Sequence, residues 1–578
     1  MTQVAVADRR LTALMLPGYA AALALAVTAP LLAPGYLLLR DAVSTPRSYL
    51  SDSAIGLGEA APRAVPQDFA VAVLSMVLDG GLIVTALLFG ALLLAGWGAG
   101  RLAALVLPDA GAAGQLVAAT VAVWNPFVAE RLLQGHWSLL VAYGCLPWVA
   151  AAVIRLRAGS TADGSAGVGA WPAMVFWIAL AGLTPTGAIL ATIVALVCVA
   201  APGVGVSRRR CAAAVAGTAL LTAGPWLMAS SLSGALGSTQ GAGLAPFAAR
   251  AEPFLGTLGS LAGLGGIWNA EAVPQSRTTG WAALATVALL AVVIAGLPAL
   301  LKRRRARPLL MLAAVSILVP AAMATGPGLA LLRAAVDVAP GLAVLRDGQK
   351  WVALAMPGYA LAGAGATLAL RRRMRPAVAA LLCCAALLAV LPDLAWGVGG
   401  RIRPVHYPGA WQQVAARVNA DPRPVAVLPA ETMRRFGWSG PAPVLDPLPR
   451  WLRAEVLVTG DLLVGGQTVP GEGSRAREVQ RLLLSGADPA ALERAGVGWV
   501  VVESGTPGTT GSAGETLRRL PEAYRDDDLA LYRVGGSAAA APAGQRIAMI
   551  AAHLLWAGLL VGSAGVLTVG RLRRGGPG

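Results

Sequence analysis

Three short segments of this sequence combine carboxylates with basic side chains in patterns that could support group-transfer chemistry. The first begins Arg40-Asp41, the second runs from Asn125-Pro-Phe-Val-Ala-Glu-Arg131 to His136, and the third reads Leu345-Arg-Asp-Gly-Gln-Lys350. A carboxylate can act as a base toward a hydroxyl group or hold a divalent cation, and arginine or lysine can hold a phosphate. The three segments together therefore suit transfer of a group from a phosphorylated donor.

Each of these charged residues also has an ordinary explanation, because charged side chains just beyond a helix end are commonly solvated. Two features favour a functional role. The chain has two lysines, and Lys350 is the one that falls on the predicted outer side of the membrane. The second segment places a charged pair, an amide and a histidine between Trp124 and Trp137, which is dense for a connecting loop.

Asp79 stands apart because it falls inside an apolar segment, in the string Leu-Asp-Gly-Gly-Leu. A charge within a membrane helix is costly and commonly faces the bundle interior or water. Two interpretations stay open: a functional polar group in the membrane, or a hydrated residue within reach of the interface.

Signatures of soluble enzymes are missing from the sequence. It has no P-loop, no G-x-G-x-x-G after a strand, no H-E-x-x-H and no G-x-S-x-G. The three histidines are too few for a histidine-rich metal site, and none of the five cysteines lies between 393 and 541. Catalysis would therefore rest on carboxylates, arginine and lysine.

The elements that must position these residues are membrane helices. Of 578 residues 56% are hydrophobic and 13% are charged, against about 25% charged in a typical soluble chain. The apolar residues fall in runs that approach or exceed the ~20 residues needed to cross a bilayer. Twelve such segments are expected, at 12–39, 69–97, 102–124, 137–154, 168–183, 188–204, 211–229, 280–301, 308–325, 351–370, 376–392 and 546–570. The pair on either side of Thr184 is the least regular, since both segments are short.

The net charge of +17 is concentrated in clusters between these segments. Outside the clusters the basic and acidic residues balance. With twelve crossings every cluster falls on one side, as the positive-inside rule requires, so we expect a multi-pass plasma-membrane protein with both termini in the cytoplasm. A nucleic-acid partner is not expected, because nothing aromatic or periodic accompanies the clusters.

Three regions are predicted from this topology. Residues 1–392 form a bundle of about eleven helices, residues 393–541 form an extracytoplasmic α/β domain, and residues 542–578 form the last helix and a basic cytoplasmic tail. The outer loops of the bundle are expected at 40–68, 125–136, 230–279 and 326–350.

The segment 393–541 is charged and rich in proline, unlike the rest of the chain. Strands are predicted at 424–429, 498–503 and 529–533, and helices at 411–419 and 474–484. Its aromatic residues could stack on sugars, but their spacing fits packing in a core equally well, and we expect a core role for Trp411, Trp438 and Trp451.

The layout resembles the GT-C superfamily of integral-membrane glycosyltransferases, and within it the large multispanning cell-envelope proteins of actinobacteria. The resemblance rests on Asp41 directly after the first helix, on the strings 125–131 and 345–350, and on an α/β domain near the C-terminus. By similarity Asp41 corresponds to the first-loop catalytic carboxylate, Glu130 to the second-loop acidic residue, and Arg346 or Lys350 to the ligand of the donor phosphate. No Asp-x-Asp occurs in these loops, so the cofactor is left open, with a divalent cation as one option.

The resemblance implies a polytopic α-helical membrane protein of about twelve helices that transfers a sugar from a polyprenyl-phosphate donor to an envelope glycan or glycolipid at the outer face. Asp41 and Glu130 would be catalytic. Four residues would bind the substrate, namely Arg131, His136, Arg346 and Lys350. The alternative is a non-catalytic assembly partner or a lipid-linked sugar transporter; a transporter favours polar groups at mid-membrane, for which Asp79 is the one candidate.

Overall fold

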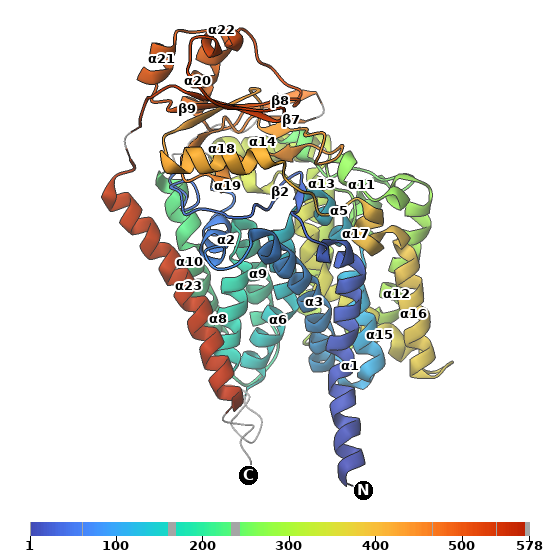
Figure 1. Cartoon of the computed structure of the whole chain (residues 1–578). Coiled ribbons are helices and arrows are strands. Elements are labelled where there is room, and N and C mark those ends of the chain that lie inside the picture. Colours follow the sequence, from blue (N-terminus) through green and yellow to red (C-terminus); the bar gives the residue numbers. More distant parts are fainter. Residues whose placement is uncertain are drawn as a thin grey trace.

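Long apolar stretches form helices in a membrane because a helix satisfies its own backbone hydrogen bonds where water cannot. The computed structural model describes residues 2–59, 62–159, 169–232, 243–464, 466–538 and 540–572. In that part of the chain the bundle (Figure 1) is built from α1 (Thr2–Thr28), α3 (Gly80–Val106), α4 (Gly111–Val123), α5 (Pro126–Gln134), α6 (Trp137–Ala158), α8 (Ala170–Ala181), α9 (Pro185–Val199), α10 (Arg208–Leu232), α12 (Trp281–Leu301), α13 (Arg307–Met323), α14 (Gly326–Val338), α15 (Met356–Leu370), α16 (Pro376–Val390) and α23 (Ala543–Leu572).

Every predicted apolar segment contains a helix, but not every helix is long enough to cross a membrane. Among the described residues eight helices are sufficiently long and apolar, or ten if each of two bent helix pairs is one span. α8 and α9 have 12 and 15 residues, short of the ~20 that a full crossing needs. The predicted multi-pass helical fold is therefore confirmed, with eight to ten helices of spanning length in the described part of the chain where twelve crossings were expected.

The predicted second segment, 69–97, is not one helix. It divides into α2 (Gln67–Leu74) and α3, and Asp79 is the residue that caps the start of α3. Its Oδ1 atom accepts a 2.8 Å hydrogen bond from the Gly81 amide, and Tyr36 donates to its Oδ2 atom at 2.9 Å. Aspartate is strongly preferred at this position because it satisfies amides that the first helical turn leaves free. Asp79 is thus a helix cap and not a polar group in the middle of a membrane helix. Its position no longer supports a transporter.

The described connections with basic clusters, such as 302–307 between α12 and α13, lie at the end of the bundle that holds the start of α1 and the end of α23, which we call the termini end (Figure 1). Arg303 forms an ion pair with Asp109 across two interhelical connections. Arg157 at the end of α6 donates to the carbonyl groups of Ala201 and Val206 ahead of α10. The opposite end, which we call the loop end, has the remaining connections and a sheet-containing region.

That sheet has five strands in the order β10 (Glu522–Arg525), β11 (Leu529–Arg533), β9 (Trp499–Glu503), β3 (Val425–Leu428) and β6 (Val456–Leu457). β9, β3 and β6 run parallel, and β11 is antiparallel to β9. The predicted strands coincide with β3, β9 and β11, and the predicted helices coincide with α18 (Gly409–Ala420) and α20 (Ser474–Leu484).

Alternation along the strands gives the sheet two apolar faces. Val425 and Val501 pack with α18, while Ala426 and Val500 pack on the opposite face with Val479 of α20. The aromatic residues join the first of these cores, with Trp411 stacked on Trp451 at a centroid distance of 6.2 Å and Trp438 packed at its edge. The structure therefore confirms the core role expected for these tryptophans.

The first loop-end connection, residues 40–68, is held against the sheet-containing region. Tyr36 and Val405 exchange two backbone hydrogen bonds of 2.9 Å just before this connection. Within it, charged residues pair with that region: Asp68 with Arg450, Arg63 with Glu472, and Glu59 with the amide of Arg475. These contacts hold the connection against the sheet-containing region.

Candidate functional site

The short helix α5 carries the second of the three charged segments and is sharply delimited. Asn125 caps its start by accepting a 3.2 Å hydrogen bond from the Val128 amide, and Pro126 takes the first helical position. Gly135 ends it with φ of +84°, and a Cβ atom there would lie 2.3 Å from the Ala42 amide nitrogen. The backbone around residue 41 therefore approaches the end of α5 so closely that only glycine fits.

Asp41 is placed by its neighbour Arg40 and by this close approach. Arg40 is buried, has φ of +48°, and donates a 2.7 Å hydrogen bond to the Leu133 carbonyl group. The Asp41 amide donates to the Gln134 carbonyl group at 3.2 Å. A positive φ at a residue other than glycine costs free energy and persists only where surrounding contacts enforce it. Here those contacts turn the carboxylate of Asp41 toward His136.

The carboxylate of Asp41 is held at one oxygen only. Its Oδ2 atom accepts hydrogen bonds from His136 Nε2 at 2.9 Å and from Gln134 Nε2 at 3.0 Å. No described residue donates to Oδ1, and 36% of the side chain is exposed. Burial acts to raise the pKa of Asp41, but the hydrogen bonds from His136 and Gln134 outweigh it and hold that pKa below the ordinary value. Asp41 is therefore an ionised carboxylate with one oxygen open to a ligand.

Arg131 fixes the orientation of His136 from behind. Arg131 is fully buried, and its Nη1 atom lies 3.0 Å from His136 Nδ1. Because a guanidinium group can only donate, Nδ1 accepts and the imidazole proton is on Nε2, facing Asp41. Arg131 also donates to both carboxylate oxygens of Asp347, at 2.6 and 2.9 Å.

Asp347 belongs to the third charged segment, so these contacts join all three segments. Burial opposes ionisation of Asp347, but the charge and hydrogen bonds of Arg131 prevail and lower its pKa to about 2. Arg131 uses its two Nη atoms to contact Asp347, Gln349 and His136. It is therefore placed to support His136 rather than to bind a substrate, which revises the role expected from the sequence.

Arg346 and Lys350, on the same third segment, are half-buried and lie near the charge of Asp347 without contacting it. Arg346 lies over the Phe247 ring at 4.3 Å, and Lys350 Nζ lies 5.5 Å from the centre of the Trp351 ring. Neither side chain makes a hydrogen bond or ion pair with any residue that the structure describes. Burial and the positive charge of Arg63 lower the pKa of Arg346 to about 10. The site thus contains two basic side chains that form no ion pair within the described chain.

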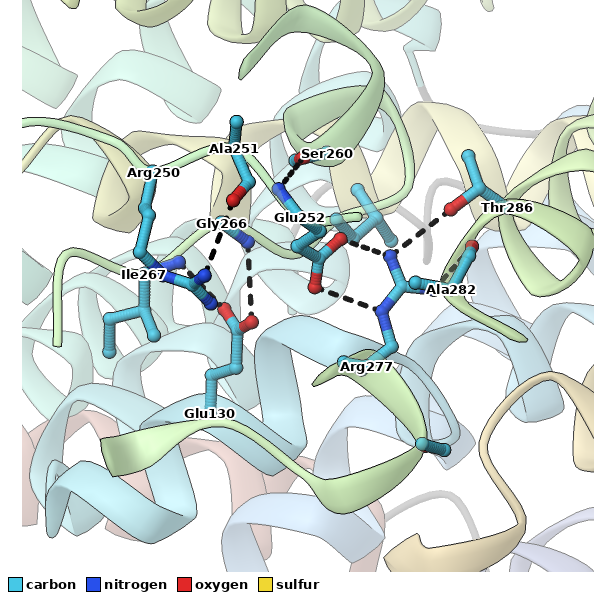
Figure 2. A network of polar contacts seen from close by, with 12 residues as sticks. Glu130, Arg250, Ala251, Glu252, Ser260, Gly266, Ile267, Arg277, Ala282 and Thr286 are labelled. Carbon is cyan, nitrogen blue, oxygen red and sulfur yellow. Dashed lines mark hydrogen bonds and ion pairs between the residues drawn. The ribbon is translucent and has the colours of Figure 1, made fainter. Parts of the chain in front are cut away.

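Glu130 makes its contacts with a different segment, the chain around Gly266 and Ile267, as Figure 2 shows. Its two carboxylate oxygens accept from the amides of Gly266 and Ile267 at 3.2 and 3.1 Å, and Gln349 donates to Oε2 at 3.0 Å. The side chain is completely buried. With both oxygens occupied and no access, Glu130 is not placed to assist Asp41, contrary to the expectation from its position in the sequence.

A buried ion pair accompanies these contacts. Glu252 accepts two hydrogen bonds from Arg277, one of them 3.0 Å long, and Arg277 also donates to the Ala282 carbonyl group and to Thr286 (Figure 2). Both charged side chains have no exposed surface. Gln349 connects Glu130 to the Asp41 site, since it accepts from Arg131 and donates to Glu130. We refer to Glu130, Glu252, Arg277 and Gln349 as the buried network.

The structure therefore brings together five of the six residues expected from the sequence: Asp41, Arg131, His136, Arg346 and Lys350. Sequence reasoning missed Gln134 and Asp347, although both stand inside the segments that it had singled out. Glu252 and Arg277 carried no local signal, because their pairing becomes visible only when the segment 244–279 folds over α5.

Metal ligands of the usual kind do not gather here. The described residues contain no group of three or more His, Cys, Asp or Glu side chains that could hold a metal ion. The groups available to a phosphate are therefore the guanidinium of Arg346 and the ammonium of Lys350, with Arg63 nearby.

The structure has helices around a polar site at the loop end and a sheet-containing region over that end of the bundle (Figure 1). The solved structure of the arabinofuranosyltransferase AftD from Mycobacteria has a similar fold, with a TM-score of 0.58 and 16% sequence identity. The likeness covers 92% of this chain and 40% of that one, so this chain spans well under half the length of AftD. No family model and no curated protein matches the sequence. The predicted resemblance to GT-C glycosyltransferases is thus confirmed at the level of the fold.

Proposed function

We propose that this chain is a GT-C-type membrane glycosyltransferase with its active site at Asp41. The observation that carries the proposal is the state of that carboxylate. It is ionised, half-buried and held at one oxygen by His136, while its other oxygen is open. Arg346 and Lys350, which are near Asp347 but form no ion pair with a described carboxylate, provide a place for an anionic leaving group in the same site. The fold that the chain shares with a known glycosyltransferase supports the same conclusion.

In this reaction the acceptor hydroxyl group donates to Asp41 Oδ1. The hydroxyl oxygen forms a bond to the anomeric carbon of the donor sugar as the bond between that carbon and the phosphate oxygen breaks. The electron pair of the broken bond stays on the phosphate, which Arg346 and Lys350 stabilise. The hydroxyl proton passes to Asp41. A carboxylate with a low pKa is a weak base, so this proton moves late, once bond formation has made the hydroxyl group acidic.

The donor is a polyprenyl-phosphate sugar and the acceptor an envelope glycan or glycolipid, at the outer face of an actinobacterial plasma membrane. The distribution of basic residues supports the outer face in this assignment. The positive-inside rule puts the basic termini end in the cytoplasm and the loop end outside. The site is then at the outer membrane surface, where a lipid carrier can present its phosphate without leaving the bilayer.

Replacing Asp41 with asparagine tests the proposal, because it keeps the size of the side chain and removes its charge. Membranes containing each variant are supplied with a labelled lipid-linked sugar, and labelled glycan is measured at equal protein level. We expect Asp41→Asn to lower transfer about 10²- to 10⁴-fold, the usual range for a catalytic base. Asp52→Asn is the control, because Asp52 is a carboxylate of the same connection that pairs with Arg546.

Transfer by Asp41→Asn at the wild-type rate would show that the assignment of Asp41 is wrong. Envelope synthesis that needs the chain but is unaffected by this substitution would favour the rival function, a non-catalytic assembly partner.

A further inference from the structure

Gln134, the last residue of α5, makes a hydrogen bond to Asp41 that depends on which way its side-chain amide is turned. Its Nε2 atom donates to Asp41 Oδ2 at 3.0 Å, and its Oε1 atom accepts from Asn269 Nδ2 at 2.8 Å. The reverse orientation would place the amide oxygen against the carboxylate of Asp41, where neither group can donate. The partner on the far side of Gln134 therefore decides whether Asp41 meets a donor or an acceptor.

Asn269 is that partner, and its own orientation is fixed by the backbone. Its Oδ1 atom accepts a 3.0 Å hydrogen bond from the Glu271 amide at the start of the 3₁₀ helix η6 (Ala270–Ala272). A backbone amide can only donate, so Oδ1 must face Glu271 and Nδ2 must face Gln134. Gln134 can offer only its oxygen to Nδ2, which leaves its Nε2 atom for Asp41. We call this series of contacts, from Glu271 through Asn269 and Gln134 to Asp41, the amide relay.

The start of the amide relay is tied back to the segment of Asp41. Arg40, the residue before Asp41, donates from Nη2 to the Glu271 carbonyl group at 3.0 Å. The Asp41 amide donates to the Gln134 carbonyl group at 3.2 Å. The contacts thus close a ring through three segments of the chain, so each segment helps to hold the other two in place.

A second series of contacts reaches the same oxygen of Asp41. Arg131 can only donate to His136 Nδ1, so His136 donates from Nε2 to Asp41 Oδ2. Both series begin at a group that can only donate, and both deliver a donor to Oδ2. Asp41 Oδ1 receives no hydrogen bond from the described residues, so it is the oxygen that remains for an acceptor hydroxyl group.

We propose that Asn269 is a positioning residue of the Asp41 site, which sets the Gln134 amide so that Oδ2 is held and Oδ1 stays open to the acceptor. Its part in transfer rests on the proposed function, whereas its effect on Gln134 and Asp41 does not. Asn269 acts through Gln134 and touches no reacting atom. The hydrogen bond from Gln134 is one of the contacts that lower the pKa of Asp41, so loss of the amide relay should raise that pKa.

Asn269→Asp breaks the amide relay with little change in shape. The new carboxylate can still accept from the Glu271 amide but cannot donate, so it draws Gln134 Nε2 toward itself and turns Oε1 toward Asp41. The pH at which Asp41 is half ionised should rise by about one to two pH units, as expected for a lost hydrogen bond to a charged group. Infrared titration of the full chain in nanodiscs measures it. Each protein is compared with the same protein carrying Asp41→Asn, which isolates the signal of Asp41.

The new charge of Asn269→Asp also favours a higher midpoint, so the substitution is repeated together with Gln134→Met. Gln134→Met alone should raise the midpoint through loss of the donor. In that background no amide can turn over, and adding Asn269→Asp should raise the midpoint much less than it does in the native chain. The charged groups that act on Asp41, namely His136, Arg40 and Arg63, are the same in all of these variants.

Asn419→Asp is the matched control. Asn419 has the same pattern of contacts in the sheet-containing region, accepting at Oδ1 from the Arg453 amide at 2.7 Å and donating from Nδ2 to the Trp451 carbonyl group at 3.2 Å. Asn419→Asp should leave the midpoint of Asp41 and the pH–rate profile of transfer unchanged. Asn269→Asp should move the acidic limb of that profile to higher pH, which a purely structural role would not do.

The proposal is overturned if Asn269→Asp leaves the midpoint of Asp41 where it was, or raises it equally with and without Gln134. In the second case only the added charge acts. Normal transfer by Asp41→Asn would instead remove the proposed function, and the infrared titration would still decide how Gln134 is oriented.

Discussion

The Asp41 site and the buried network are neighbours, yet they use the same kinds of residue in opposite ways. Both pair carboxylates with arginines, and α5 with its capping residues contributes to both. In the buried network every carboxylate oxygen of Glu130 and Glu252 is occupied and neither side chain is exposed. In the Asp41 site one carboxylate oxygen is open and two basic groups lack a partner.

The difference shows how to tell a supporting charge from a reacting one. Glu130 is a carboxylate in a charged loop segment, as Asp41 is, so residue type does not separate the two. What separates Glu130 from Asp41 is hydrogen-bond completion, because a carboxylate whose oxygens are all occupied within the protein has nothing left to offer a substrate. The buried network should therefore determine stability and the Asp41 site activity.

Breaking the ion pair of the buried network should have the largest effect on stability. Arg277→Met leaves Glu252 buried without its partner, which typically costs about 3–5 kcal/mol. We expect a large fall in the melting temperature of the purified protein in detergent. Arg303→Met is the control, because the ion pair of Arg303 with Asp109 is exposed and such pairs contribute about 0–1 kcal/mol. Equal melting temperatures for the two variants would contradict the assignment.

Glu130→Gln sharpens the comparison within α5. The amide group cannot accept from both backbone amides and from Gln349 as the carboxylate does, so we expect a loss of about 1–3 kcal/mol in stability. Transfer activity per folded molecule should stay within a few-fold of wild type. If Glu130→Gln lowers activity as much as Asp41→Asn and leaves the melting temperature unchanged, Glu130 is a catalytic residue and not a structural one.

The two lysines of the chain, Lys302 and Lys350, allow a test of whether Lys350 binds the donor phosphate. Lys350→Met removes an ammonium group that lacks a close partner, so it should raise the KM for the lipid-linked donor about tenfold, equivalent to about 1.4 kcal/mol of donor binding. Lys302→Met, at the termini end, removes the other lysine and should change nothing. An unchanged donor KM in Lys350→Met would exclude this residue as a phosphate ligand.

Substitution of His136 should have the smallest effect of these variants, a shift in the pH dependence of transfer. Transfer requires the Asp41 carboxylate, which exists above its pKa, and the hydrogen bond from His136 lowers that pKa. Without this bond the effect of burial dominates, so His136→Ala should move the acidic limb of the pH–rate profile to higher pH. His136→Gln keeps an N–H donor and should move it less. A limb that stays in place in both variants would show that His136 does not set the ionisation of Asp41.

Hydropathy and turn chemistry predicted much of the fold. Every predicted apolar run contains a helix, and the predicted strands coincide with β3, β9 and β11, whereas α5 and α14 fall in segments that were predicted to be loops. The errors have local physical causes. The aspartate-glycine pair at 79–80 starts a helix where the apolar run continues, and α8 and α9 pack within the protein although they are too short to span a bilayer.

The site was predicted only in part, for a different reason. Asp41, His136, Arg346 and Lys350 could be proposed because residue type and loop position mark them. Glu130 has the same type and position, and only the amides of Gly266 and Ile267 from a distant segment show that it is a buried support. Hydrogen-bond completion is a tertiary property, so no pattern along the chain could have separated the two carboxylates.

A structure of the chain with a bound polyprenyl phosphate would test the central claim most directly. The account predicts phosphate density within hydrogen-bonding distance of Lys350 Nζ and the Arg346 guanidinium, with the lipid tail leaving into the bilayer and Asp41 facing the opposite side of the phosphate. Density for the phosphate at the basic termini end, or in no contact with either side chain, would contradict it.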